Sequence, residues 1–245
     1  MAPGAPHPPK PSAEQADALL ELWNQLREDE AFWSPWRTLM ALLYAAWALT
    51  LLALLLFPSW AQAQPQPQPP AAAARWRAEL VRAAHTQWGL DAPVAALAAQ
   101  VHQESGWNPQ AVSAVGARGM AQFMPGTARW WCELNGLGAA QCQPHNPVWA
   151  LRALVGYDKW LFDRTPLRYT ARDRLWVALR AYNGGLGHWQ AEALATGLAH
   201  PGREQVDAAC GRARRHVSHC AENLAYPQRI LQLLQPRYAS WGGVL

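Results

Sequence analysis

Residues 38–57 constrain the architecture of this chain more than any other stretch. The run from Thr38 to Phe57 contains no charged residue in 20 positions, and a helix of that length spans about 30 Å, the hydrocarbon thickness of a membrane. Arg37 precedes the run, and no Lys or Arg follows it until Arg75. Because basic residues stay on the cytoplasmic side of a membrane, the sequence predicts one transmembrane helix with a cytoplasmic N-terminus.

A signal peptide is the alternative interpretation of the same run. Ala61-Gln62-Ala63 has the small-x-small pattern of a cleavage site. The apolar run is longer than the core of a usual signal peptide, however, and an unusually long segment precedes it. We therefore expect an uncleaved, single-pass anchor in the inner membrane. Cleavage near Ala63 would export the C-terminal part of the chain to the periplasm as well.

The sequence around this run falls into three further segments. Residues 1–37 form a tail in which Ser12-Ala13-Glu14-Gln15 has the pattern of a capping box, and an amphipathic helix is expected to continue to about Arg27. This helix is expected either to stay solvated near the membrane or to dock a partner. Residues 58–74 are expected to form an extended linker, because Gln and Pro alternate from Gln64 to Pro70 and a run of Ala follows. Residues 75–245 are the exported domain.

The exported domain is basic. Residues 75–245 contain 18 Lys and Arg against 11 Asp and Glu, a net charge of +7. Such a domain suits an anionic partner, which is nucleic acid, a membrane surface or an acidic cell wall. Since no nucleic-acid-binding motif accompanies the charge, we expect the wall and no nucleic acid. The sequence shows no Gly-rich phosphate loop and no constellation of metal ligands, so neither a cofactor nor a metal is expected.

Hydrophobic periodicity predicts that the exported domain is helical almost throughout. The expected helices cover residues 74–88, 91–104, 125–134, 147–162, 173–182, 186–197, 203–216 and 221–235. At most one short strand is expected beside them. The predicted fold class is therefore all-α, or an α-rich α+β domain, preceded by one transmembrane helix.

Glu104 is the first candidate for a catalytic residue. Asp91 suits the N-cap of the helix that leads to it, and Pro93 suits the first turn. The apolar residues of that helix share one face: Val94, Leu97, Ala98 and Val101. Glu104 continues this face, so its carboxyl group is expected to be partly desolvated, which raises its pKa. A carboxyl that stays protonated near neutral pH can act as a general acid on a glycosidic bond.

Three further motifs follow Glu104-Ser105 along the chain. They are Gly119-Met120-Ala121-Gln122, Ala181-Tyr182-Asn183 and Glu222-Asn223-Leu224-Ala225-Tyr226-Pro227-Gln228-Arg229-Ile230. In this order the four motifs resemble those of the soluble-type lytic transglycosylases, the SLT domain of glycosidase family 23, which has a lysozyme-like fold. The resemblance covers about residues 75–245. It departs from the family's Gly-Leu-Met-Gln at the two middle positions and keeps only part of its late Glu-Thr-Arg-Asn-Tyr segment.

The resemblance implies a lyase that acts on peptidoglycan glycan strands. It would cleave the β-1,4 bond between N-acetylmuramic acid and N-acetylglucosamine and leave a 1,6-anhydro sugar. Glu104 would first protonate the leaving oxygen and then accept the proton of the attacking C6 hydroxyl. An attacking group within the same molecule gains from its proximity, and a second catalytic carboxylate is then unnecessary. No other acid follows Glu104 until Glu133.

The resemblance also implies roles for five other side chains. Ser105 would hydrogen-bond the acid or the sugar beside it, and Gln122 and Asn183 would hold N-acetyl or hydroxyl groups. Tyr182 would orient Glu104, and Tyr226 would line the cleft or pack beside it. The two methionines of this region, Met120 and Met124, are expected to pack beneath the cleft.

Four cysteines, Cys132, Cys142, Cys210 and Cys220, lie in the exported domain. An oxidising compartment favours two disulfides, for which three pairings exist. Each local pair is ten residues apart and flanks a loop, so we expect Cys132–Cys142 and Cys210–Cys220. Histidines lie nearby, but their spacing matches no zinc-binding pattern.

Two other functions stay open at this point. A hydrolase of the goose-type lysozyme kind would need a second acid to position water, and Asp158 and Glu222 are the candidates. A wall-binding scaffold without catalysis is the other alternative, and an intact Glu104 argues against it. The biological setting is expected to be an envelope-spanning secretion or conjugation complex, or a phage.

Overall fold

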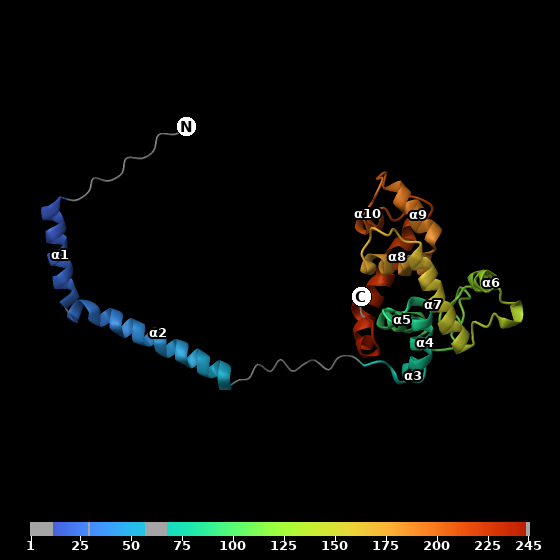
Figure 1. The fold of residues 1–245 in the computed structure, drawn as a ribbon, viewed down its shortest axis with the longest axis horizontal. Helices are drawn as coiled ribbons and strands as arrows, with labels where there is room; N and C mark the ends of the chain where they lie inside the picture. Colours follow the sequence, from blue (N-terminus) through green and yellow to red (C-terminus); the bar gives the residue numbers. More distant parts are fainter. Residues whose placement is uncertain (1–11, 29, 57–67, 244–245) are drawn as a thin grey trace. The chain divides into compact units, whose positions relative to one another are not determined.

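The computed structural model describes residues 12–28, 30–56 and 68–243 (Figure 1). The chain divides into two compact units, residues 1–64 and residues 65–245. The Ala61-Gln62-Ala63 cleavage pattern and most of the predicted linker lie outside the described residues.

The first unit contains two helices, α1 (Ala13–Glu28) and α2 (Glu30–Leu56). The predicted capping box is confirmed, because the backbone N of Ser12 donates to Gln15 Oε1 at 3.0 Å and the backbone N of Gln15 donates to Ser12 Oγ at 3.3 Å. Large apolar side chains of α2, among them Leu42, Tyr44 and Trp47, are exposed. Among the described residues, none of the helices combines the length and the apolar character needed to span a membrane.

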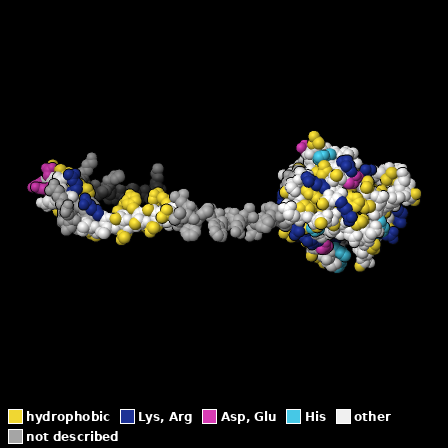
Figure 2. Space-filling view, turned by 90° about the horizontal axis from the view of Figure 1, so that it is seen from below, with side chains coloured by type: hydrophobic (Ala, Val, Ile, Leu, Met, Phe, Trp, Pro, Cys, Tyr) yellow, Lys and Arg dark blue, Asp and Glu magenta, His cyan; other side chains and the backbone are white. Residues whose placement is uncertain are grey.

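The second unit is built from helices. They are α3 (Ala71–Ala74), α4 (Arg77–Trp88), α5 (Val94–Ser105), α6 (Pro125–Leu134), α7 (Pro147–Asp163), α8 (Ala171–Gly184), α9 (Leu186–Ala195), α10 (Arg203–Ala208) and α11 (Cys220–Gln228), with short helical turns η1 (Ala139–Gln141), η2 (Val217–His219), η3 (Arg229–Leu234) and η4 (Gln235–Trp241). Residues 68–243 contain no β-strand, only isolated bridges at Val112–Arg118 and Arg118–Phe123. The predicted α-rich class is confirmed. Figure 2 shows Lys and Arg side chains spread over one face of this unit.

Helix α5 lies beside the C-terminal segment of the chain, which is drawn in red (Figure 1). Every residue from Val94 to Val101 is buried, because α4 packs against the helix and η3 and η4 pack against it as well. A helix that is apolar on all sides is typical of a core position. The expectation of a single apolar face was therefore too narrow, since the alanines between the predicted positions are buried too.

The N-terminus of α5 differs from the prediction. The helix begins at Val94, Pro93 occupies the cap position, and no side chain caps the first turn. The first N–H groups of a helix need acceptors, and here the backbone N of Ala95 donates to the carbonyl of Gly242 at 2.9 Å. Asp91 was wrong as the N-cap because a carbonyl from the far end of the chain takes this place.

The C-terminus of α5 is fixed by an aromatic cluster. Gly106 ends the helix in the left-handed conformation with φ +57°. The buried Trp107 follows it, and its indole Nε1 donates to the hydroxyl of Tyr238 at 2.7 Å. The same hydroxyl lies 2.8 Å from Nδ1 of His102. This cluster holds the last turn of α5, which carries Glu104, in one place.

Both predicted disulfides are confirmed. Cys132 pairs with Cys142 and Cys210 pairs with Cys220, each with Cα atoms 5.9 Å apart. One predicted helix boundary near the second bridge was wrong. A helix was expected over residues 203–216, but α10 ends at Ala208. The chain then turns through Gly211 at φ +80°, which lets the loop close onto Cys220.

Candidate active site

Glu104 lies in the last turn of α5, at a cavity of about 290 Å³. The loop between α5 and α6 and residues of α7 and α8 provide the other walls, among them Gln122, Phe123 and Tyr157. Glu104 is the only acid among the described residues that line this cavity. Burial raises the pKa of Glu104 from 4.5 to about 7, and the nearby charge of Glu222 adds to the rise. The desolvated carboxyl predicted from the helix pattern is confirmed.

Tyr226 is the residue that holds this carboxyl. Its hydroxyl donates a hydrogen bond to Oε1 of Glu104, which opposes part of the rise in the pKa of Glu104. The hydroxyl of Tyr182 donates instead to the carbonyl of Ala121 at 2.7 Å. The predicted assignment is therefore reversed, since Tyr226 orients the acid and Tyr182 anchors the neighbouring loop. Burial raises the pKa of both phenols well above 10, so both remain hydrogen-bond donors.

The loop of residues 119–122 is fixed by its backbone. Gly119 has φ +72°, and a Cβ atom there would lie 1.8 Å from the carbonyl oxygen of Pro144, so the position requires glycine. The hydroxyl of Ser105 donates to the carbonyl of Met120 at 2.8 Å. Ser105 thus ties the last turn of α5 to this loop and does not hydrogen-bond Glu104; its other predicted role, a hydrogen bond to the sugar, stays a prediction. Met120 is buried as expected, whereas Met124 is exposed at the rim.

The two predicted amide side chains lie on the cavity wall. Nε2 of Gln122 donates to the carbonyls of Gly119 at 2.8 Å and Ala111 at 3.3 Å, so only its carbonyl oxygen remains for a sugar group. Oδ1 of Asn183 accepts from Nδ2 of Asn223 at 2.9 Å. Its own amide nitrogen is therefore the group that remains for a substrate.

A buried cluster behind Asn183 was missed by the sequence analysis. Asn223 donates to the carbonyl of Arg180 at 2.8 Å and accepts from Nε of Arg180 at 3.0 Å. The guanidinium of Arg180 pairs with Glu192 at 2.7 Å and Asp207 at 2.6 Å. Buried charges require such partners. The cluster fixes the angle of α8 and with it Asn183, but its members come from α8, α9, α10 and α11 and share no motif.

The model of the transglycosylase SLT domain matches residues 79–198 of this sequence. The chain carries a transglycosylase SLT domain. Over 92 residues, it is 41% identical to the membrane-bound lytic murein transglycosylase F of Maricaulis maris and 39% identical to that of Idiomarina loihiensis. Each alignment covers 38% of this chain and 18% of the relative, so the chain spans about a fifth of the length of these relatives.

The fold of the SLT domain is shared with a solved structure. The 70 kDa soluble lytic transglycosylase of Escherichia coli matches 69% of this chain and 25% of its own chain, with a TM-score of 0.53 and 21% sequence identity. This likeness concerns the fold and confirms the predicted lysozyme-like helical architecture.

Asp158, a candidate second acid, is sealed inside the SLT domain. It is fully buried on α7, and its Oδ1 accepts from Nε2 of Gln100 at 3.3 Å. Oδ2 of Asp158 and Oε1 of Gln100 are both buried without a hydrogen-bond partner among the described residues. Burial raises the pKa of Asp158 well above 3.8. One proton on the carboxyl would join these two oxygens, so the pair suits a neutral acid and amide.

Glu222, the other candidate, lies outside the cavity that contains Glu104. Its side chain is 61% exposed and pairs with Arg229. Glu222 is therefore an exposed partner of an arginine and does not contribute a second acid to this cavity.

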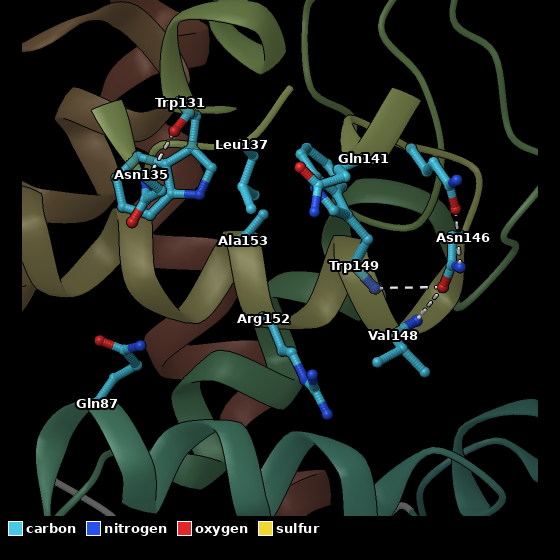
Figure 3. A pocket seen from close by; sticks show the side chains of 11 residues that line it. Gln87, Trp131, Asn135, Leu137, Gln141, Asn146, Val148, Trp149, Arg152 and Ala153 are labelled. Carbon is cyan, nitrogen blue, oxygen red and sulfur yellow. Dashed lines mark hydrogen bonds between the residues drawn. The ribbon is translucent and has the colours of Figure 1, made fainter. Parts of the chain in front are cut away.

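A separate cavity of about 480 Å³ lies between α4, α6, η1 and α7 (Figure 3). Its amide side chains serve the backbone, since Asn146 caps α7 through Val148 and Trp149, and Asn135 donates to the carbonyl of Trp131 at 2.7 Å. Within the described part of the chain, no acid and none of the predicted site residues lines it. This cavity therefore lacks a group that could protonate a glycosidic oxygen.

Proposed function

We propose that the protein is a peptidoglycan lytic transglycosylase that cleaves the β-1,4 bond between N-acetylmuramic acid and N-acetylglucosamine. One observation carries the proposal. Glu104 is the only acid among the described residues that line its cavity, and burial raises its pKa to about 7. Near neutral pH this carboxyl is divided between its acid and base forms, so one group can serve both steps.

The reaction follows from this single group. The protonated carboxyl of Glu104 gives its proton to the glycosidic oxygen, and the bond to the anomeric carbon breaks. The resulting carboxylate accepts the proton of the sugar's C6 hydroxyl while the C6 oxygen bonds to the anomeric carbon. The product is a 1,6-anhydro sugar, water is not consumed, and Glu104 regains its proton. Tyr226 holds the carboxyl in position through both steps.

Hydrolysis on the same fold is the alternative. It needs a second ionised carboxylate near the reacting carbon. Asp158 is buried with a raised pKa, and Glu222 is exposed beside Arg229. Neither side chain lines the cavity of Glu104, so the geometry favours the lyase. The intact carboxyl in a cavity also argues against a scaffold without catalysis.

The decisive experiment is mass analysis of the products that full-length protein releases from purified sacculi. The lyase yields muropeptides that are about 18 Da lighter than lysozyme products, because water is not added, and that lack a reducing end. Asp158→Asn is expected to keep activity within about threefold of wild type, because a neutral amide replaces a neutral acid. Products with a reducing end, together with a loss of at least about 10²-fold in Asp158→Asn, would establish hydrolysis instead.

We also propose that the SLT domain works in the periplasm while residues 38–57 hold the chain at the inner membrane. The support is the uncharged run from Thr38 to Phe57, with Arg37 before it. A tethered lyase that opens the wall locally would suit an envelope-spanning secretion or conjugation complex, or a phage. Fractionation tests the anchor. Full-length protein is expected in the membrane fraction, and a mature N-terminus at Gln64 would show cleavage instead.

A further inference from the structure

A second cavity of about 520 Å³ adjoins the wall of the catalytic cavity. It lies between the end of α8, the start of α9 and the loop closed by Cys210–Cys220. Asn183 lines both cavities. A group bound in the second cavity is therefore next to a residue that the substrate also meets.

The lining of this cavity is basic. Its side chains include Arg214, Arg215 and three histidines, His188, His216 and His219. The disulfide loop that supplies most of them, residues 211–219, also contains Arg212 and has no acidic residue. Glu222 is the one acid on the lining among residues that the structure describes, and it is paired with Arg229. Clustered cations beside a concave surface favour an anion.

Arg215 is a buried residue on the lining of this cavity, and its guanidinium is held by an acidic partner. It is 6% exposed, and its Nε donates to Oε1 of Glu192 at 2.7 Å. Its Nη2 is buried without a hydrogen-bond partner among the described residues, and the same holds for Nδ1 of His188. Gly184 leaves room for this guanidinium, because a Cβ there would lie 2.2 Å from Nη1. An unpaired buried donor is costly, and a bound anion would compensate for it.

We propose that this cavity, the loop-closed basic cavity, binds a carboxylate of the peptide stem that peptidoglycan carries on its muramic acid. The inference rests on the proposed function and adds a recognition site to it. The glycan strand itself is uncharged apart from such stems, so a cation cluster beside Asn183 faces the part of the substrate that carries the negative charge. Because the stem is attached to the sugar, one strand can occupy both cavities, and linked binding sites reinforce each other.

The test measures binding of full-length protein to soluble glycan strands by sedimentation, with Glu104→Gln present in every sample, the one with a wild-type loop included, so that no strand is cleaved. The strands come in three forms: with intact peptide stems, with amidated stem carboxyls, and stripped of stems with the lactyl carboxyl that this exposes also amidated. Arg215→Lys keeps a cation for Glu192 but removes the unpaired Nη2. Arg214→Gln removes an exposed charge. We expect affinity for intact strands to fall about tenfold and about threefold, respectively. Arg212→Gln, in the same loop but outside the cavity lining, is the matched control and is expected to bind as wild type does.

Two arms separate the explanations. Wild type is expected to bind amidated and stripped strands more weakly than intact ones, and the variants are expected to bind those two forms as wild type does. The proposal would be overturned if the two variants lost as much affinity for stripped strands as for intact ones. It would also be overturned if both variants bound intact strands as wild type does, or if the Arg212→Gln control lost as much affinity as they do. Arg214-dependent binding of anionic phospholipid vesicles in place of strands would also overturn it. Binding and product analysis are separate measurements. If the protein released no anhydro products, the proposed lyase activity would be refuted, while the binding result would still decide the recognition site.

Discussion

The two cavities that share Asn183 differ in how they are assembled. The catalytic cavity is lined by Glu104 and by residues of the Gly119–Gln122 and Ala181–Asn183 motifs, and its chemistry depends on a desolvated carboxyl. The basic cavity depends on cations held by a disulfide loop that belongs to no motif. We therefore propose that cleavage and recognition lie on separate surfaces of one domain and expect that each can be disrupted without the other.

Glu104→Gln should give the largest effect, and it should abolish cleavage without changing the binding of strands. We expect cleavage of sacculi to fall by at least about 10²-fold, because the amide cannot donate or accept the proton. Binding of intact strands should stay as in wild type, because the basic cavity is untouched. Clearing of a sacculus suspension measures the first, and sedimentation measures the second. The exposed Glu133→Gln is the control, and near-normal clearing by Glu104→Gln would remove this residue from the mechanism.

Variants that lack one disulfide or the other can distinguish an effect on stability from an effect on strand binding. Replacing either cysteine pair by alanine is expected to lower the free energy of unfolding by about 2–4 kcal/mol, because each bridge restricts the unfolded chain. Only the Cys210–Cys220 variant should also bind intact strands more weakly, since it frees the loop that holds Arg214 and Arg215. Thermal unfolding and sedimentation below the melting temperature give the two readouts. Equal binding losses in both variants would show that the loop acts through stability alone.

The sequence predicted the catalytic side well for a physical reason. Glu104 continues the apolar face of its helix, a pattern that favours a desolvated carboxyl, and the resemblance to the transglycosylase family added the other residues of the cavity. The local cysteine spacing likewise allowed the correct pairing of both bridges. The helix pattern and the cysteine spacing depend on neighbours in the sequence, so periodicity and spacing contain the information needed for these two features.

The errors concern contacts between distant segments. Tyr226 reaches Glu104 from a position 122 residues away, and no local pattern distinguishes it from Tyr182. The first turn of α5 is capped by Gly242 in place of Asp91. Arg180 and Glu192 pair inside a core where the sequence shows only ordinary helix charges. For the basic cavity a signal did exist, namely three arginines and two histidines between Cys210 and Cys220 without an acid.

The raised pKa of Glu104 should also be visible in stability, as a smaller effect on the catalytic side. Its folded pKa of about 7 exceeds the ordinary 4.5, so the unfolded chain loses this proton first as the pH rises. The contribution to the free energy of unfolding therefore falls between pH 4.5 and 7. Glu104→Gln escapes this loss and is expected to be more stable than wild type by about 2–3 kcal/mol at pH 8. Denaturant unfolding at pH 4 should show no such advantage, and an advantage equal at both pH values would contradict the raised pKa.

The smallest predicted effect decides which tyrosine serves the acid. Tyr226→Phe removes the hydrogen bond that holds the pKa of Glu104 down, so this pKa should rise further above 7. The alkaline limb of the rate profile, where the acid loses its proton, should then move to higher pH, and kcat should fall about tenfold because the carboxyl is less well oriented. Tyr182→Phe loses only the bond to Ala121 and should leave the limb in place. If the limb shifted in Tyr182→Phe and stayed in place in Tyr226→Phe, Tyr182 on α8 would be the residue that orients Glu104, as the sequence analysis expected, and Tyr226 on α11 would not.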